Sequence, residues 1–327
     1  MHGDLDAWLD ASAGTDAEFV ERAWRLVVRR RVDDAARERA LAALADGSLS
    51  RSGLLRELVG SDEFAEVAAL DAAVAGAAAD RVAPRSVRGP ARPRGLGAPP
   101  SSDERPVEIH WCLARYDGEP RVLDVGYAFA EPAYLAGLAG LGASELVGVD
   151  LAEAEVPGLR PVVADVRELP FEDGSFDLAL CISTLEHVGR DNDVYSVDAP
   201  REDAGDEAAL HELRRVLAPG GRLLVSVPTG AAEDQGWQVQ RTPDEWVAGF
   251  ERAGFVVFED ELYLHAPDGW RSATPTEVGD IAYGAAGPGA GAVLVAELHP
   301  RTLGERVRLA VRDVRHRGDP RRSTRPS

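Results

Sequence analysis

Polar or small residues stand at the ends of three short apolar runs in the middle of the chain. They are Gly126, Asp150 and Asp165. A glycine lets a ligand approach the backbone closely, and an acid roughly 20 residues further on, the place of Asp150, can accept both hydroxyl groups of a ribose. The carboxylate of Asp165 can accept from an exocyclic amine while the Val166 amide donates to a ring nitrogen. This pattern predicts a nucleoside-binding site.

The pair Glu186-His187 follows a fourth apolar run and is the candidate for catalytic chemistry. A histidine can accept the proton of a reacting hydroxyl group as a general base, and a neighbouring acid can orient its ring. His187 is therefore our candidate base, and Glu186 beside it could orient the imidazole or contact the substrate. The alternative is that His187 makes only a local hydrogen bond and that Glu186 is a solvated acid at a helix entry.

The loop after Gly126 limits the kind of nucleoside. A dinucleotide places its pyrophosphate at the helix entry of such a loop, where the charge of Glu131 would repel it. A nicotinamide-dependent dehydrogenase is therefore disfavoured. The small side chains of Ala128 and Ala130 leave space over the strand end.

Strand and helix patterns alternate through this region and position the candidate residues. Apolar runs predict strands at 121–125, 146–150, 161–165, 176–182, 222–227, 255–258 and 292–298, and helical patterns cover 131–141, 206–217 and 243–253. Such alternation indicates an open, doubly wound and mostly parallel α/β sheet. Ligands of these sheets bind beyond the carboxyl ends of the strands, where the candidate residues fall.

Four segments in this order resemble the class I S-adenosylmethionine-dependent methyltransferases: VLDVGYAFAEP, LVGVDLA, ADVRELPFEDGSFDLALCISTLEHVG and HELRRVLAPGGRLLVSVP. The resemblance implies a seven-stranded Rossmann-like sheet and S-adenosylmethionine as the cofactor. The implied cofactor-binding residues are Asp124, Gly126 and Ala128 in the first loop, Asp150 at the ribose, Leu151, Asp165 and Val166 at the adenine, and Cys181 and Ser183 beneath the sulfonium. The family usually has glycine where this chain has Ala128 and Ala130.

The segment CISTLEHVG and the insert after it are similar to a bacterial subgroup associated with surface polysaccharides and glycolipids. The implied activity is O-methylation of a sugar hydroxyl group in a surface glycan or its precursor. Two alternatives stay open: methylation of a small hydroxylated metabolite, and a non-catalytic scaffold, which the two loop alanines motivate. The insert 192–203 is a candidate lid or a loop without a role. His265 with Tyr263 and Trp270 is a candidate substrate wall or ordinary packing.

Composition divides the chain into four parts. Residues 1–78 predict a small all-α bundle, residues 79–106 a linker rich in Pro, Gly and Arg, residues 107–299 the sheet domain, and residues 300–327 a basic helix and tail. The segments FVERAWRLVVRR, DGSLSR and SDEF resemble phycobilisome-linker-like modules, which implies docking rather than catalysis. The tail, with nine arginines and three acids, is a candidate for contact with an acidic membrane surface. The alternative is a helix packed on its own domain.

The composition of the whole chain excludes several classes of function. Its 327 residues are 45% hydrophobic, enough for a substantial core, and 56 acids against 36 bases give a net charge of −20, which disfavours a nucleic-acid partner. Cys112 and Cys181 supply neither a disulfide framework nor a zinc site. No His, Asp or Glu cluster has convincing metal-ligand spacing, although Asp191, Asp193 and nearby acids leave a divalent ion open as an alternative. No signal peptide or membrane span is visible, so we expect a soluble cytoplasmic protein.

Overall fold

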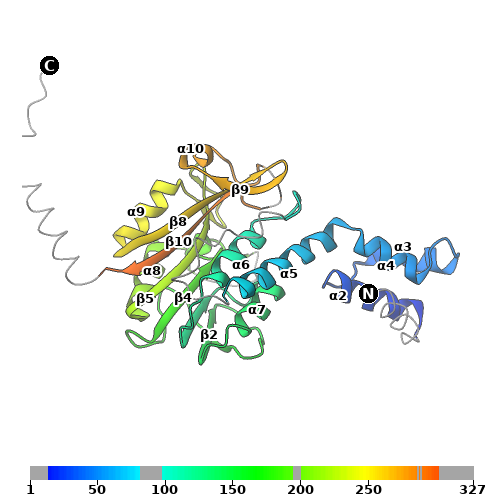
Figure 1. Ribbon diagram of the computed structural model, residues 1–327, viewed down its shortest axis with the longest axis horizontal. Coiled ribbons are helices and arrows are strands. Elements are labelled where there is room, and N and C mark those ends of the chain that lie inside the picture. The colour runs from blue at the N-terminus through cyan, green and yellow to red at the C-terminus, as the bar shows by residue number, and fades with distance from the viewer. Residues whose placement is uncertain (1–13, 82–97, 194–199, 286, 288, 302–327) are drawn as a thin grey trace, which may run out of the picture.

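The computed structural model describes residues 14–81, 98–193, 200–285, 287 and 289–301, and a single large sheet forms its centre (Figure 1). The strands of this sheet are β1 (Arg121–Val125), β2 (Glu145–Asp150), β3 (Arg160–Val163), β4 (Phe176–Ile182), β5 (Leu217–Pro228), β8 (Phe255–Ala266), β9 (Gly269–Ala273) and β10 (Ala292–Pro300). Their order is β3-β2-β1-β4-β5-β10-β8-β9. The predicted doubly wound, mostly parallel sheet is confirmed. It has eight strands rather than the implied seven, because β9 folds back on β8 as a hairpin.

The order of the strands determines where a ligand can bind. From β1 the chain continues to β2 and β3 on one side and to β4 and β5 on the other, and all four of these pairings are parallel. β10 is antiparallel to both β5 and β8. The order therefore reverses between β1 and β4, and open sheets bind their ligands at such a switch point.

Helices cover both faces of the sheet (Figure 1). On one face lie α6 (Arg105–Ala114) and α7 (Pro132–Ala139), and on the other lie α8 (Gly205–Val216) and α9 (Pro243–Arg252). Trp111 of α6 is buried in the hydrophobic layer between the sheet and α6 and α7, and Trp246 of α9 is buried in the layer between the sheet and α8 and α9. Because the inner strands are buried on both faces, they appear in the sequence as unbroken apolar runs.

Three short elements complete the sheet domain. The 3₁₀ turn η2 (Leu185–His187) follows β4 and carries the candidate base. A small hairpin of β6 (Glu233–Asp234) and β7 (Val239–Gln240) lies between β5 and α9, and the sequence analysis does not predict it. The helix α10 (Pro275–Val278) follows β9.

Within the described residues, the N-terminal part is all-α, as the sequence predicts, and consists of α2 (Asp16–Val27), α3 (Asp34–Ala45), α4 (Arg51–Val59) and α5 (Asp62–Asp80). Each begins at a polar N-cap whose side chain accepts a backbone hydrogen bond, namely Thr15, Asp33, Ser50 and Ser61. Phe19, Trp24 and Leu55 form the centre of a separate hydrophobic core. These helices therefore have a core of their own, apart from the two layers on the sheet.

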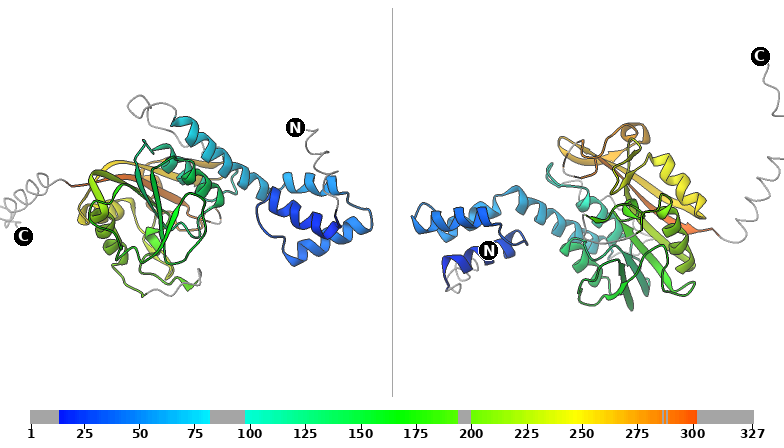
Figure 2. Two further views of the ribbon diagram at one scale, coloured as in Figure 1. Left: turned by 90° about the horizontal axis from the view of Figure 1, so that it is seen from below. Right: turned by 180° about the vertical axis from the view of Figure 1, so that it is seen from behind.

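The 19-residue helix α5 joins these helices to the sheet (Figures 1 and 2). Phe64 near its start packs on the helical core, whereas Val74 near its end packs on the layer of α6 and α7. The sequence places a linker at 79–106, but α5 runs to Asp80 and α6 already begins at Arg105. Pro106 does not prevent this early start, because the first turn of a helix tolerates proline. Residues 82–97 of the expected linker lie outside the described part.

Buried charges attach α6 to the sheet. The guanidinium group of Arg115 lies 2.5 Å from the carboxylate of Glu261 on β8, and Trp111 Nε1 donates to the same carboxylate at 2.9 Å. Arg222 on β5 pairs with the fully buried Glu297 on β10 at 3.3 Å and donates to the Arg115 carbonyl at 2.5 Å. These contacts fix the helix that brings Arg105 and Glu108 to the carboxyl ends of the strands.

We predict that Gly148→Ala lowers the free energy of unfolding by about 1–3 kcal/mol, measured by urea denaturation. A Cβ at Gly148 would stand 2.7 Å from the ring of buried Tyr127 and 2.7 Å from the side chain of Leu159, so both would have to move. The control is Gly140→Ala, because Gly140 has a negative φ and its nearest neighbours would lie at 3.4 Å. An equal loss in the two variants would contradict the expected overlap.

Candidate active site

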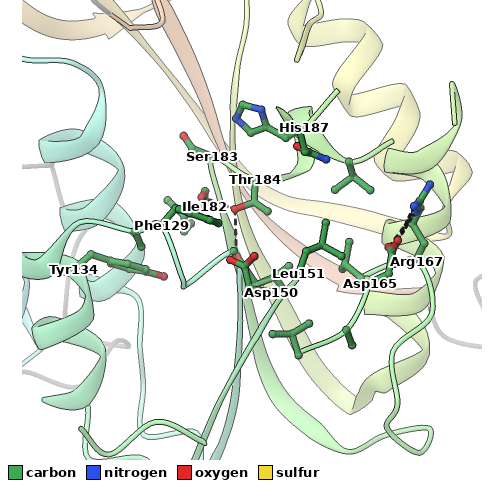
Figure 3. A pocket seen from close by; sticks show the side chains of 18 of the residues that line it. Phe129, Tyr134, Asp150, Leu151, Asp165, Arg167, Ile182, Ser183, Thr184 and His187 are labelled. Atoms are coloured by element: carbon green, nitrogen blue, oxygen red, sulfur yellow. Dashed lines mark hydrogen bonds and ion pairs between the residues drawn. The ribbon is translucent and has the colours of Figure 1, made fainter. Parts of the chain in front are cut away.

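A cleft opens at the carboxyl ends of β1, β2 and β4, at the switch point of the sheet (Figure 3). The space between its walls is about 1200 Å³ when the open mouth is included. Its walls include seven residues that the sequence analysis selects: Gly126, Asp150, Leu151, Asp165, Val166, Ser183 and His187. The fold therefore brings together residues from four separate segments.

Asp150 is held in place at the end of β2 by two backbone amides. The Ala128 amide donates to Oδ2 at 3.0 Å and the Ala152 amide to Oδ1 at 3.2 Å. Burial raises the pKa of Asp150, and these amides partly offset that effect. Ala128 does not line the cleft, which corrects its expected position. It acts through its amide, while its side chain packs on the apolar layer of α7.

Gly126 is required by a close approach between β1 and β4. Its φ is +88°, and a Cβ there would overlap the hydroxyl group of Thr184. That hydroxyl donates to the carbonyl groups of Val125 at 3.1 Å and Ile182 at 3.0 Å. A side chain at position 126 would therefore disturb both strand ends.

Asp124 is buried directly before the cleft wall and does not itself line the cleft, so its expected role at the methionine end stays a prediction. It is 1% exposed, and the hydroxyl group of Tyr134 donates to its Oδ1 at 2.5 Å. Its Oδ2 is buried and has no hydrogen-bond partner among the described residues. Burial raises the pKa of Asp124 to about 7. A buried acceptor without a partner, one residue before Val125 and Gly126 in the cleft wall, suits a cationic group of a ligand.

Asp165 faces the cleft with a partner of its own (Figure 3). Arg167 Nη2 donates to Oδ2 at 2.6 Å, and Nε lies 3.0 Å from both oxygens. Burial alone would raise the pKa of Asp165, but the hydrogen bonds from Arg167 outweigh burial and lower it. The carboxylate is thus fixed and charged, and the sequence analysis did not predict the arginine that holds it.

Cys181 does not line the cleft, contrary to what the resemblance implies. Its side chain is 1% exposed and packs in the hydrophobic core on the α8 and α9 face. Side chains of a strand alternate between the faces of a sheet, and it is the next residue, Ile182, that reaches the cleft together with Ser183 and Thr184 (Figure 3).

Arg105 and Glu108 of α6 belong to the site, although the sequence analysis missed them. Arg105 lines the cleft and its Nη1 donates to Glu108 at 3.1 Å. The fully buried Glu108 also accepts from the hydroxyl group of Ser183 at 2.8 Å, and the Ser183 amide donates to Ser226 Oγ at 3.0 Å. Burial raises the pKa of Glu108, and Arg105 opposes this. The available signal was an acid inside the apolar stretch VEIHWCLA.

His187 lines the cleft from η2 and is neutral at pH 7. Burial lowers its pKa to about 4. Its Nδ1 lies 3.1 Å from the Trp237 carbonyl oxygen, and because a carbonyl only accepts, we assign the proton to Nδ1 and the lone pair to Nε2. This tautomer can accept a proton at Nε2.

Glu186 stands behind His187 and does not line the cleft. Its side chain is 3% exposed, with Oε1 3.8 Å from His187 Nε2, and Oε2 has no hydrogen-bond partner among the described residues. Burial raises the pKa of Glu186 to about 8, and the neighbouring Glu108 adds to the rise. The solvated helix-entry acid is therefore ruled out, and direct contact with a substrate in the cleft is not supported.

The late aromatic residues do not form a substrate wall, so ordinary packing explains them. His265 stacks on Trp270 with ring centroids 4.9 Å apart, and Tyr263 is buried with them. His265 Nε2 lies 2.8 Å from the Pro100 carbonyl oxygen, and Trp270 donates to the Ser102 carbonyl at 3.2 Å. These side chains hold the segment before α6 on the sheet.

Other expectations concern absences or residues outside the described part. Among the described residues, no group of three or more His, Cys, Asp or Glu side chains can hold a metal ion. No helix in the same part of the chain has the length and apolar content needed to cross a bilayer. Of the candidate lid, residues 194–199 lie outside the described part, as does the basic tail from residue 302.

Residues 123–225 match the protein family described as "Methyltransferase domain". The match covers most of β1 to β5, including the strand ends that form the cleft. In this part of the chain, the sequence is thus similar to methyltransferase domains.

Individual relatives are similar over parts of the chain. The demethylmenaquinone methyltransferase of Thermus thermophilus is 36% identical over 124 residues, 35% of this chain and 49% of that protein. The EEF1A lysine methyltransferase 4 of Mus musculus is 37% identical over 78 residues, 24% of this chain and 30% of that protein. The chain thus spans half or less of these curated relatives. A solved structure, the 1,6-didemethyltoxoflavin-N1-methyltransferase of Burkholderia thailandensis with bound S-adenosylhomocysteine, is 18% identical with a TM-score of 0.39, covering 72% of this chain and 89% of that one.

We predict that Asp124→Asn flattens the pH dependence of stability. The pKa of Asp124 is raised from 3.8 to about 7, so between these values the native state keeps a proton that the unfolded state releases. The contribution of Asp124 to the free energy of unfolding is therefore greatest at low pH and is lost as the pH rises through 7. The variant should reduce the fall in the free energy of unfolding by up to about 1.4 kcal/mol per pH unit in this range. Urea denaturation from pH 4.5 to 7.5 measures it.

Asp165→Asn is the matched control for this measurement. The pKa of Asp165 is lowered, so this group titrates below the tested range and its removal should leave the slope as in the wild type. If Asp124→Asn and the wild type have equal slopes, Asp124 is ionised throughout and our account of its burial is wrong.

Proposed function

We propose that this protein is an S-adenosylmethionine-dependent methyltransferase. The observation that carries the proposal is one cleft at the switch point, in a domain that matches methyltransferases, which combines Gly126, Asp150 and the Val166 segment. The acid Glu131 lines the cleft at the helix entry after Gly126 and would repel a phosphate. Asp150 at the end of β2 and the Val166 amide after β3 suit the ribose and the base of an adenosine that carries no phosphate.

The residues present fit this cofactor. Asp150 would accept from the ribose hydroxyl groups, because each of its oxygens takes only one amide and keeps a lone pair. Leu151 would pack on the adenine, with the Val166 amide and Asp165 at its edge. The buried Oδ2 of Asp124 would accept from the ammonium group at the methionine end. Arg105, held by Glu108, would face the carboxylate of the same end.

The cofactor supplies a methyl group that is already activated by a positively charged sulfur. The protein therefore has to align the acceptor, exclude water and take away one proton. We assign the proton of an acceptor hydroxyl group to Nε2 of His187, whose neutral ring lines the cleft. Glu186, with Oε1 at 3.8 Å from Nε2, stabilises the resulting imidazolium when it is ionised.

We propose a sugar hydroxyl group as the acceptor, in a bacterial surface glycan or glycolipid precursor. The support is a neutral base beside the cofactor site and the similarity of CISTLEHVG to the subgroup named above. A small hydroxylated metabolite would use the same base, so it is the second candidate. In this proposal the protein acts in the cytoplasm, the helices α2 to α5 dock it to a partner, and residues 300–327 contact the membrane.

Cofactor binding is tested by calorimetric titration with S-adenosylhomocysteine. We expect the wild type to bind and Asp150→Asn to bind about tenfold or more weakly, because hydrogen bonds to a charged group contribute about 1.5–3 kcal/mol. Asp177→Asn is the control, since Asp177 pairs with Arg121 at the opposite ends of the strands and should leave the affinity unchanged. If the folded wild type does not bind millimolar ligand, the scaffold alternative replaces the enzyme.

The role of His187 is tested by His187→Gln. Nucleotide sugars are first screened with a labelled methyl donor to find an acceptor. Loss of the base should lower turnover by about 100-fold or more, while the affinity for S-adenosylhomocysteine stays within twofold. His211→Gln, on the exposed side of α8, is the control and should keep full turnover. Unaltered turnover in His187→Gln would remove this residue as the base.

A further inference from the structure

We propose that the β6–β7 hairpin, residues 233–240, holds His187 in the tautomer and orientation that proton acceptance requires, with Trp237 as the positioning residue. This inference rests on the proposed function, because it concerns the base assigned there. The hairpin lies between β5 and α9, outside the matched residues 123–225. It adds nothing to the cofactor part of the cleft, so its effect on His187 can be separated from cofactor binding.

Trp237 contacts His187 in two ways. Its carbonyl oxygen accepts from Nδ1–H at 3.1 Å, and its indole lies against the imidazole with ring centroids 5.3 Å apart and the planes 31° from parallel. The carbonyl selects the tautomer with the lone pair on Nε2, and the indole shields the imidazole from water. One residue therefore sets both the orientation of the base and its neutrality.

The hairpin is itself fixed to the segment that follows His187. The Asp191 amide donates to the Gly236 carbonyl at 3.0 Å, and Arg190 Nη1 lies 2.9 Å from Asp234 Oδ2. The side chain of Arg190 is 6% exposed and that of Asp234 is 47% exposed, so solvent screens this ion pair in part. The Arg190 amide in turn donates to the His187 carbonyl at 3.1 Å. The hairpin thus contacts His187 directly through Trp237 and indirectly through Arg190.

Further contacts fix the conformation of the hairpin turn and the position of the Trp237 side chain. Gly236 has a φ of +85°, and the Gln235 amide donates to the Gln238 carbonyl at 3.0 Å, which closes a tight turn around Trp237. The far side of Trp237 meets Tyr283 edge to face, with centroids 6.0 Å apart. The indole is therefore packed between two rings and cannot swing away without breaking both contacts.

Few charged groups act on His187. Glu186 belongs to the same turn, with Oε1 3.8 Å from Nε2, and Arg105 reaches the ring from α6 and disfavours its protonation. From the hairpin side, the hydrogen bond to Trp237 favours protonation, but burial outweighs it. Removing the indole of Trp237 reduces this burial and keeps the backbone carbonyl, so it should make His187 easier to protonate.

The experiment follows the imidazole of His187 by nitrogen-15 NMR in the full chain, with His187→Gln to assign its signals. Three variants are compared with the wild type: Trp237→Ala, Trp237→Phe and Asp234→Asn. Trp237→Ala removes the shield and should raise the pKa of His187 by about one unit or more. Asp234→Asn removes the ion pair with Arg190 and should mix the two tautomers. Trp237→Phe keeps a ring in place and should stay close to the wild type.

Kinetics with an identified acceptor provides the second measurement. We expect Trp237→Ala and Asp234→Asn to lower kcat by about tenfold or more with an unchanged affinity for S-adenosylhomocysteine. If both variants keep the wild-type pKa and tautomer of His187, the hairpin does not position it and the inference is overturned. If the NMR shifts occur but His187→Gln retains turnover, the hairpin positions a residue that is not the base, and the proposed mechanism fails instead.

Discussion

The close approach of two strand ends at Gly126 is the constraint on which the rest of the cleft depends. Because Gly126 has no side chain and a φ of +88°, the loop after β1 turns directly against Thr184 at the end of β4. The same turn brings the Ala128 amide onto the carboxylate of Asp150 and so fixes the acid at the end of β2. Three strands thus contribute to one binding surface, although only backbone atoms of the loop make the connection. An alanine at position 128 is compatible with this geometry, because what the loop needs from that residue is its amide.

Burial determines the charge of the groups around this turn. Burial raises the pKa of Asp124 to about 7 and that of Glu186 to about 8, and it lowers the pKa of His187 to about 4. A low-dielectric surrounding disfavours every charged form, so it makes acids neutral and a histidine neutral at once. Asp165 shows the opposite result, since the hydrogen bonds from Arg167 overcome burial and keep it ionised. Asp165 at the cleft is therefore charged, whereas burial disfavours the charged forms of Asp124, Glu186 and His187. In our proposal, the bound ammonium group supplies the hydrogen-bond partner for Asp124.

The two halves of the site have different origins in the chain. The cofactor half consists of strand ends within residues 123–225, where the methyltransferase match lies. Elements outside this range add to both halves. Before β1, the helix α6 supplies Arg105, held by Glu108, to the cofactor half, and after β5 the β6–β7 hairpin supplies Trp237 to the acceptor half. Ser183 and His187, which follow β4, connect the halves through Glu108 and Trp237. In our proposal this division separates the general chemistry of methyl transfer from the choice and activation of the acceptor.

The sequence alone determined the alternation of strands and helices, because apolar runs and helix caps are local properties. The bounds of β1 and β4 agree with the prediction, and the residues at the strand ends lie at one edge because parallel strands must end there together. Tertiary structure decided which side each residue faces. Cys181 and Ile182 are both apolar neighbours in a strand buried on two faces, so the pattern cannot show which of them reaches the cleft. Arg105 and Trp237 reach the site through packing between distant segments, and His265 leaves it for the same reason. Such contacts depend on how whole elements pack in space, which spacing along the chain does not encode.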